Sequence, residues 1–154
     1  MPYGSSHLAA DAARSADRQQ IMVLKARYMR FVDTKQWPAL ASLFAEDATF
    51  HFPEVRPELF GKAEMLKLIV DSLDDSISIH HGHMPEIEFH GPDRASGIWA
   101  MEDRIIYSPS ARARHGLAQM YGFGHYHESY ILSGENWLIT QLTLTRLHKV
   151  EIPV

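Results

Sequence analysis

The sequence lacks several of the usual means of cross-linking or anchoring a protein. It contains no cysteine, which excludes disulfides, thiolate catalysis and cysteine-ligated zinc or iron–sulfur clusters. No apolar run approaches the roughly 20 residues of a membrane span, and the N-terminal segment lacks the basic and apolar regions of a secretory signal. A chain without cysteine suits a reducing compartment, so we expect a cytoplasmic protein that does not bind membranes.

Basic charge is also scarce. The chain has 15 lysine and arginine residues against 19 aspartate and glutamate residues, a formal net charge of −4. Nucleic-acid and anionic membrane surfaces require a basic excess, so we expect neither partner. The two glycines of Gly122-Phe-Gly124 lack the strand-to-helix context of a nucleotide-binding loop, and we expect no cofactor.

The order of periodicities along the 154 residues predicts the fold class. Helical spacing of apolar residues is found over 17–34, 37–45 and 62–73. A short strand over 48–52 precedes the third helix, and period-two alternation then predicts four long strands, over 77–89, 97–107, 117–132 and 137–150. Helices followed by meandering strands are typical of an α+β protein. We expect a cone in which the helices cover the concave face of a curved, mostly antiparallel sheet.

The same periodicities predict the limits of the domain. We expect a flexible arm over 1–16, one domain over 17–150 and a short tail over 151–154. Irregular loops over 53–60 and 108–116 are candidates for lids over a cavity.

Several ionisable residues lie where the pattern predicts burial. Tyr28 and Asp33 lie on or beside the apolar face of the first helix. A carboxylate near a helix C-terminus is disfavoured by the helix dipole, so Asp33 should have a partner. In the first long strand the odd-numbered residues are apolar, which predicts that His81 and His83 point inward and that His80 points outward. The same argument predicts inward positions for Asp103 and Arg146.

These groups suit proton transfer. A carboxylate that binds one imidazole nitrogen raises the basicity of the other, so Asp33 could prepare His81 to take a proton. Arg146 could hold an oxyanion, and Tyr28 could donate a hydrogen bond. Structural alternatives stay open: Asp103 and Arg146 equally fit an ion pair, and Tyr28 fits a pocket wall. His81 also fits a histidine packed in the core, and Asp33 a residue that bonds the next turn.

The motifs of the chain resemble the SnoaL-like branch of the NTF2-like superfamily. The resemblance covers residues 17–149 and is carried by Ile21-x-x-Leu24-x-x-Arg27-Tyr28, Asp33, Phe44-Ala45-Glu46-Asp47, His81, Gly97-Ile98-Trp99, Gly124-His125-Tyr126-His127 and Leu144-Thr145-Arg146-Leu147. This branch includes scytalone dehydratase, bile-acid 7α-dehydratase and hexachlorocyclohexane dehydrochlorinase. The resemblance implies that the chain folds as an NTF2-like cone and forms dimers or trimers.

The resemblance also implies roles for single residues. Asp33 and His81 match the Asp–His dyad of these lyases, and Tyr28, Asp103 and Arg146 match further site positions of the bile-acid enzyme. We therefore expect a lyase or isomerase, without cofactor, that acts on a small, mostly apolar, cyclic substrate. The residues expected to bind this substrate are His83, Trp99, Met101, Phe52 and Leu144.

Other functions stay open. The chain could be a non-catalytic binding module, or an epoxide hydrolase in which Asp33, Arg146 and Asp103 activate water. The His-x-His pairs His81-Gly-His83 and His125-Tyr-His127 are typical of metal sites. The carboxylate expected after the first pair, Glu86, falls in the outward register, so we expect no bound metal.

Overall fold

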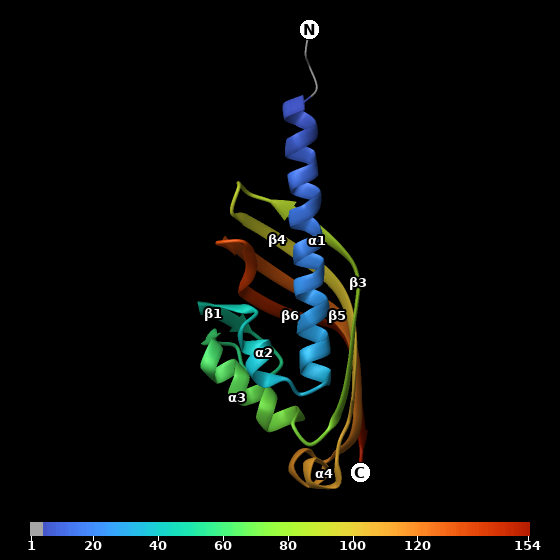
Figure 1. Ribbon diagram of the computed structural model, residues 1–154. Helices are drawn as coiled ribbons and strands as arrows, with labels where there is room; N and C mark the ends of the chain where they lie inside the picture. Colours follow the sequence, from blue (N-terminus) through green and yellow to red (C-terminus); the bar gives the residue numbers. More distant parts are fainter. Residues whose placement is uncertain (1–4) are drawn as a thin grey trace.

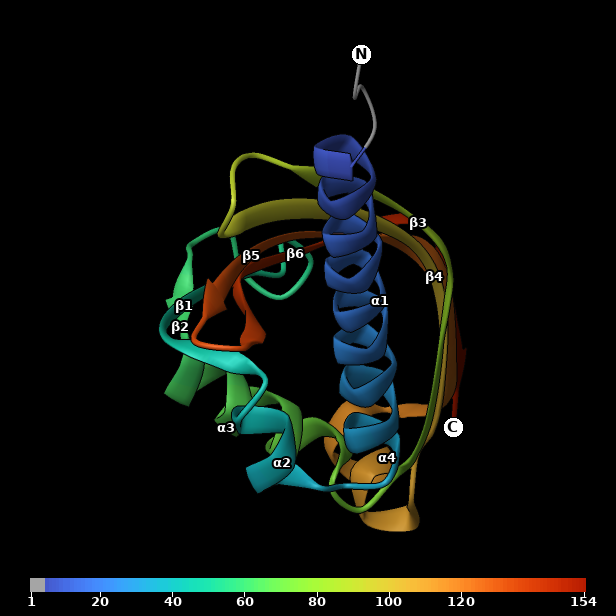
Figure 2. The ribbon, with the colours of Figure 1, turned by 45° about the horizontal axis from the view of Figure 1, so that its top comes forward.

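One curved sheet wraps around one long helix. The computed structural model describes residues 5–154, with side chains from residue 14 onward. Helix α1 (Ser5–Asp33) lies along the concave face of the sheet (Figures 1 and 2). The strand order is β2-β1-β6-β5-β4-β3. The strands are β1 (Phe44–His51), β2 (Phe60–Gly61), β3 (Ile77–Phe89), β4 (Arg94–Ile106), β5 (Leu117–Ser133) and β6 (Asn136–Pro153).

The sheet is mixed but mostly antiparallel. Only β1 and β6 run parallel; the other neighbouring strands pair antiparallel. Helices α2 (Trp37–Ala41) and α3 (Lys62–Leu73) lie beside β1, and α4 (Pro109–His115) lies at the opposite end of the sheet from the start of α1 (Figure 1). The predicted α+β cone with a curved sheet is thus confirmed. None of the helices within residues 5–154 is both long and apolar enough to cross a bilayer.

Several element boundaries differ from the sequence predictions, among them that of β1, which begins at Phe44, and that of β4, which begins at Arg94. Helix α1 begins at Ser5, inside the predicted arm, of which residues 1–4 lie outside the described part of the chain. Helix α2 ends at Ala41 because the chain turns there into β1, which pairs with β6 from Phe44 onward. Residues 109–115 form α4 instead of a loop, since the Ser108 hydroxyl accepts the Ala111 N–H at the helix start. Strand β6 continues through most of the predicted tail.

Strand β3 contains a bulge that reverses its faces. Its pairing with β4 shifts between Gly82 and Pro85, where β3 has one residue more than its partner. Before the bulge the even-numbered residues point inward, and Ile77 is 59% exposed. After it Ile87 packs into the core. The predicted orientation of His80 and His81 is therefore wrong, because a single register was assumed for the whole strand.

The core between α1 and the sheet contains a buried ion pair. The Lys25 ammonium on α1 binds the Glu128 carboxylate on β5, and both side chains are almost fully buried. The Tyr130 hydroxyl donates to the second carboxylate oxygen of Glu128 at 2.5 Å, and the indole N–H of Trp99 donates to Tyr130 at 2.8 Å. This chain of contacts joins α1, β4 and β5 in a part of the core where unpaired polar groups would be costly.

We expect Lys25→Met to lower the free energy of unfolding by about 3–5 kcal/mol, because it leaves the Glu128 carboxylate buried without its cation. The double variant Lys25→Met/Glu128→Gln should regain a large part of this loss, since a neutral amide still accepts the Tyr130 hydrogen bond. Urea unfolding measures both. As a control, Lys67→Met removes the exposed pair with Asp71 and should cost under about 1 kcal/mol. Equal losses in the two single variants would contradict this interpretation.

Candidate functional site

A cavity of about 260 Å³ lies between α1, α3 and the inner face of the sheet. We call it the central cavity. Its wall is formed by side chains from α1, α3 and five strands or the segments beside them, among them Tyr28, Phe52, Ile69, His80, Asp103, Ile105, Tyr107, Met120, Tyr126, Leu144, Arg146 and Lys149. An apolar cavity of about 150 Å³ can hold benzene, so the central cavity has room for a molecule of one or two rings.

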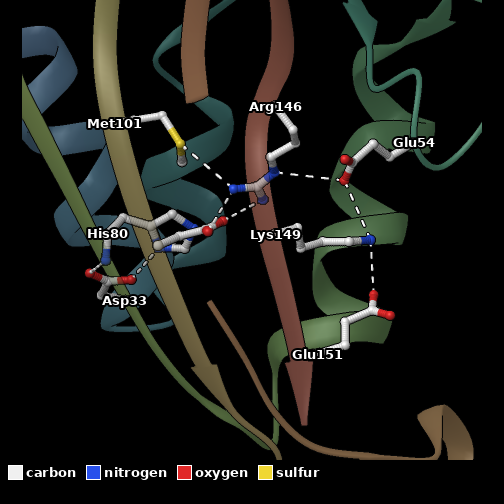
Figure 3. A network of polar contacts seen from close by, with 8 residues as sticks. Asp33, Glu54, His80, Met101, Arg146, Lys149 and Glu151 are labelled. Atoms are coloured by element: carbon white, nitrogen blue, oxygen red, sulfur yellow. Dashed lines mark hydrogen bonds and ion pairs between the residues drawn. The ribbon is translucent and has the colours of Figure 1, made fainter. Parts of the chain in front are cut away.

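Asp33 holds His80 against this cavity. The carboxylate of Asp33, the last residue of α1, accepts the His80 backbone N–H at 2.8 Å and contacts Nδ1 of the imidazole at 2.6 Å. With Nδ1 donating to this carboxylate, the neutral ring carries its lone pair on Nε2. The ring is nearly buried and lines the central cavity; Figure 3 shows it between Asp33 and Arg146. The partner of Asp33 in the structure is thus His80.

The predicted Asp33–His81 pair does not form. The His81 side chain is 63% exposed and lies on the outer face of the sheet, with Nδ1 3.3 Å from Glu102. His83 is also exposed, with Nε2 3.8 Å from the same carboxylate. The predicted inward orientation of both histidines is wrong, because the bulge that begins after Gly82 separates two opposite registers. His80, the neighbour that the alternation places outside, occupies the inward position.

Asp103 and Arg146 form a buried, two-point ion pair on the cavity wall. Nη1 and Nη2 of Arg146 donate to the two carboxylate oxygens of Asp103 at 2.7 and 2.6 Å. The two residues lie on β4 and β6, so the guanidinium must cross the intervening strand β5. It does so over Gly122, where a Cβ atom would lie 2.6 Å from Nη1. The predicted inward positions of both residues agree with the structure, and glycine at this position gives the pair its space.

Two tyrosines supply neutral donors to the cavity. Tyr28 on α1 and Tyr126 on β5 pack edge to face, with ring centroids 5.7 Å apart. Burial raises the pKa of both phenols, and for Tyr28 the nearby Glu128 carboxylate adds to the rise. The Lys25 ammonium lies 4.0 Å from the centroid of the Tyr28 ring and 3.5 Å from that of Tyr126. Both hydroxyls therefore stay protonated at neutral pH.

The predicted substrate-binding residues divide into two groups. Phe52 and Leu144 line the central cavity, and their contact with a substrate stays a prediction. Trp99 and Met101 are buried but lie outside its lining; the Trp99 indole is engaged with Tyr130, and the Met101 sulfur lies 3.7 Å from Nη1 of Arg146. A separate groove between α1 and the β3 bulge includes Trp99 in its wall.

Several cavity residues escaped the sequence analysis. Tyr126 alternates with the inward residues Glu128 and Tyr130, a signal that the less regular pattern of this strand obscured. His80 carried no such signal. Lys149 and the loop residue Glu54 lie at polar positions that sequence alone does not assign to a site.

Among the described side chains, neither a metal-binding group nor a pair of aspartates around Arg146 is formed. In the part of the chain with described side chains, no group of three or more histidine, aspartate and glutamate residues is arranged to hold a metal ion. The rings of His125 and His127 are 6.2 Å apart, and His127 contacts the Thr145 hydroxyl at 3.0 Å. Asp33 binds His80, so of the expected aspartates around Arg146 the structure brings Asp103 to it.

We expect the free energy of unfolding to fall as the pH rises through 10. The ordinary tyrosine pKa is 10.0, and burial raises the pKa of Tyr28 and Tyr126 in the folded state. Above pH 10 the unfolded chain therefore loses protons that the folded chain keeps, which favours unfolding. Urea unfolding on both sides of pH 10 measures this fall, and Tyr126→Phe should reduce it. An unchanged pH dependence in Tyr126→Phe would contradict the assignment.

Comparisons with known proteins agree with this architecture. A protein of Gibberella zeae named "Probable cyclase FGR4" is 26% identical over 134 residues, which cover 80% of this chain and 87% of that protein. A hexachlorocyclohexane dehydrochlorinase of type 2 has a similar fold, with a TM-score of 0.78, 21% identity, and coverage of 92% of this chain and 93% of that one. A proposed scytalone dehydratase from Novosphingobium aromaticivorans matches with a TM-score of 0.77, 16% identity, and coverage of 94% and 93%.

The family itself follows from a direct match. A model of the SnoaL-like domain matches residues 13–143, which is most of the chain and contains α1 from Ala13 onward and the strands through the first half of β6. The two similar solved structures share the fold at low identity. The resemblance inferred from the motifs is thereby confirmed: the chain belongs to the SnoaL-like domain family and has the NTF2-like cone fold.

Proposed function

We propose that this protein is a lyase, acting without a cofactor, that removes a proton from a carbon atom of a mostly apolar, cyclic molecule. The observation that carries the proposal is the Asp33–His80 pair at the wall of an apolar cavity. An imidazole whose Nδ1 is bound to a carboxylate is a stronger base at Nε2. His80, and not His81, is then the base.

The proposed reaction begins with transfer of a proton from carbon to Nε2 of His80. The electron pair of the broken C–H bond forms a new double bond, and the leaving group departs from the neighbouring carbon with its own bonding pair. If that group is a hydroxyl, the imidazolium returns the proton to it and water leaves. Tyr28 and Tyr126, as neutral donors, stabilise negative charge on an activating carbonyl oxygen.

Asp33 is a positioning residue in this scheme. It fixes the tautomer and the orientation of the His80 ring, and its negative charge stabilises the imidazolium that forms. The Asp103–Arg146 pair places a third polar group on the same wall. The activities named for the similar proteins, a dehydrochlorinase, a proposed dehydratase and a cyclase, support a reaction of this class.

The competing functions have less support. An epoxide hydrolase of the expected kind needs two aspartates around Arg146, whereas Asp33 is committed to His80. A non-catalytic binding module would not require a histidine oriented by two contacts to one carboxylate. The site geometry therefore favours proton abstraction, and turnover separates it from binding alone.

We expect the protein to accelerate exchange of the α-protons of a two-ring ketone, 2-tetralone, in deuterium oxide. Exchange reports proton abstraction without requiring the natural leaving group, and proton NMR measures its rate. His80→Ala should lose about 10²- to 10⁴-fold of the acceleration. His81→Ala is the matched control, since it removes the adjacent, exposed imidazole, and should keep the rate.

Asp33→Asn tests the positioning role separately. It should lower the exchange rate, because the amide no longer fixes the tautomer and the orientation of the His80 ring. Circular dichroism checks that each variant is folded. Equal exchange rates in His80→Ala and the unchanged protein, or a loss confined to His81→Ala, would contradict His80 as the base. Binding of the ketone without any exchange would favour the binding module.

A further inference from the structure

The rim of the central cavity has two cations that share one carboxylate of the protein itself. Arg146 and Lys149 lie on β6, and Glu54 lies in the segment between β1 and β2 (Figure 3). One oxygen of Glu54, Oε2, is 3.7 Å from Nε of Arg146 and 3.6 Å from Nζ of Lys149. All three side chains line the cavity. Both distances exceed those of a good hydrogen bond, so the carboxylate lies between the cations without being closely bound to either.

Arg146 is left with an unused donor at this place. Its side chain is nine-tenths buried, and its two Nη atoms are committed to Asp103. Its Nε is one of two buried side-chain nitrogen or oxygen atoms without a hydrogen-bond partner among the described side chains; the other, on Arg56, lies outside the cavity. An unsatisfied buried donor is uncommon, and this one is directed toward the position of the Glu54 carboxylate.

Glu54 is suited to leave this position. Its side chain is partly exposed, and it belongs to a non-helical segment whose residues Val55 and Leu59 are also exposed. Lys149 keeps a second partner, Glu151, at 2.9 Å. A ligand carboxylate that replaced Glu54 would leave the charge of the rim unchanged, and it could approach both donors more closely than a side chain tethered to the loop.

We propose that Nε of Arg146 and Nζ of Lys149 form a carboxylate-binding subsite, which Glu54 occupies when no ligand is bound. The ligand is then a cyclic carboxylic acid, with its rings in the apolar cavity and its carboxylate at the rim. This inference deepens the proposed function, on which it rests only in placing the rings beside His80. The subsite itself is a matter of binding and requires no turnover.

The test compares 2-naphthoate with its neutral isostere 2-naphthamide, by calorimetric titration. The unchanged protein should bind the acid more tightly than the amide. Glu54→Gln should increase the affinity for naphthoate by about tenfold, because it removes the competing charge, and leave that for naphthamide unchanged. Lys149→Met should lower the affinity for naphthoate by a similar factor and have no effect on naphthamide.

Two matched controls remove surface charges away from the rim. Glu46→Gln removes the exposed carboxylate that pairs with Lys62, and Lys67→Met removes an exposed ammonium on α3; neither should change the affinity for naphthoate. If Glu54 only held the segment between β1 and β2 in place, Glu54→Gln would change the affinities for naphthoate and naphthamide equally. That result would overturn the proposal. So would a lack of naphthoate binding to Glu54→Gln.

The outcome is independent of the proposed reaction. His80→Ala should keep the preference for naphthoate over naphthamide, because it leaves the rim intact. A retained preference together with no proton exchange in any variant would refute the lyase and keep the subsite. Exchange that depends on His80, with no preference for the acid, would refute the subsite and keep the lyase.

Discussion

The carboxylate of Asp33 joins the end of α1 to β3, and the geometry of the site depends on this contact. It accepts the backbone N–H of His80 and contacts Nδ1 of the same residue. One group therefore fixes both the position of the strand and the orientation of the ring on it. A carboxylate at the end of a helix opposes the helix dipole, and two donors from a single residue offset that unfavourable placement. The contacts that offset the unfavourable position of the Asp33 carboxylate thus also place the His80 imidazole at the cavity wall.

This contact is compatible with the core only because β3 contains a bulge. The residues before the bulge, Ser78 and His80, face the helix end, whereas Ile87 beyond it must face the core. A strand with uniform alternation cannot present positions 80 and 87 on one face, since they differ by an odd number. Gly82 lies where the register begins to shift, and a Cβ atom there would collide with the side chain of Met29 on α1. The strand can therefore lie close to the helix at this point.

The regularity of the alternation along each strand decided which inward-facing residues could be predicted from the sequence. Strand β4 alternates without interruption, so the inward position of Asp103 followed directly from its neighbours Met101 and Ile105. In β3 the odd-numbered isoleucines before the bulge are partly exposed. Their apolar side chains predicted that the odd-numbered residues face the core, whereas the even-numbered residues do. The pairing of Asp103 with Arg146 was one of several possibilities because the strands that carry them are not adjacent. It requires a long side chain that crosses β5 above a glycine, and only the folded sheet shows which glycine that is.

Most of the charged side chains around the cavity are paired with a side chain of opposite charge. Lys25 is paired with Glu128 behind the tyrosines, and Arg146 is paired with Asp103 on the wall. Each pair is close to neutral as a unit, which lets ionised groups border an apolar space at a tolerable desolvation cost. Among the directional groups that remain are an imidazole nitrogen opposite the Asp33 contact and a guanidinium N–H at the rim. In the two proposals taken together, the ligand presents the carbon that loses a proton to His80 on β3 and its negative charge to the donors of Arg146 and Lys149 on β6.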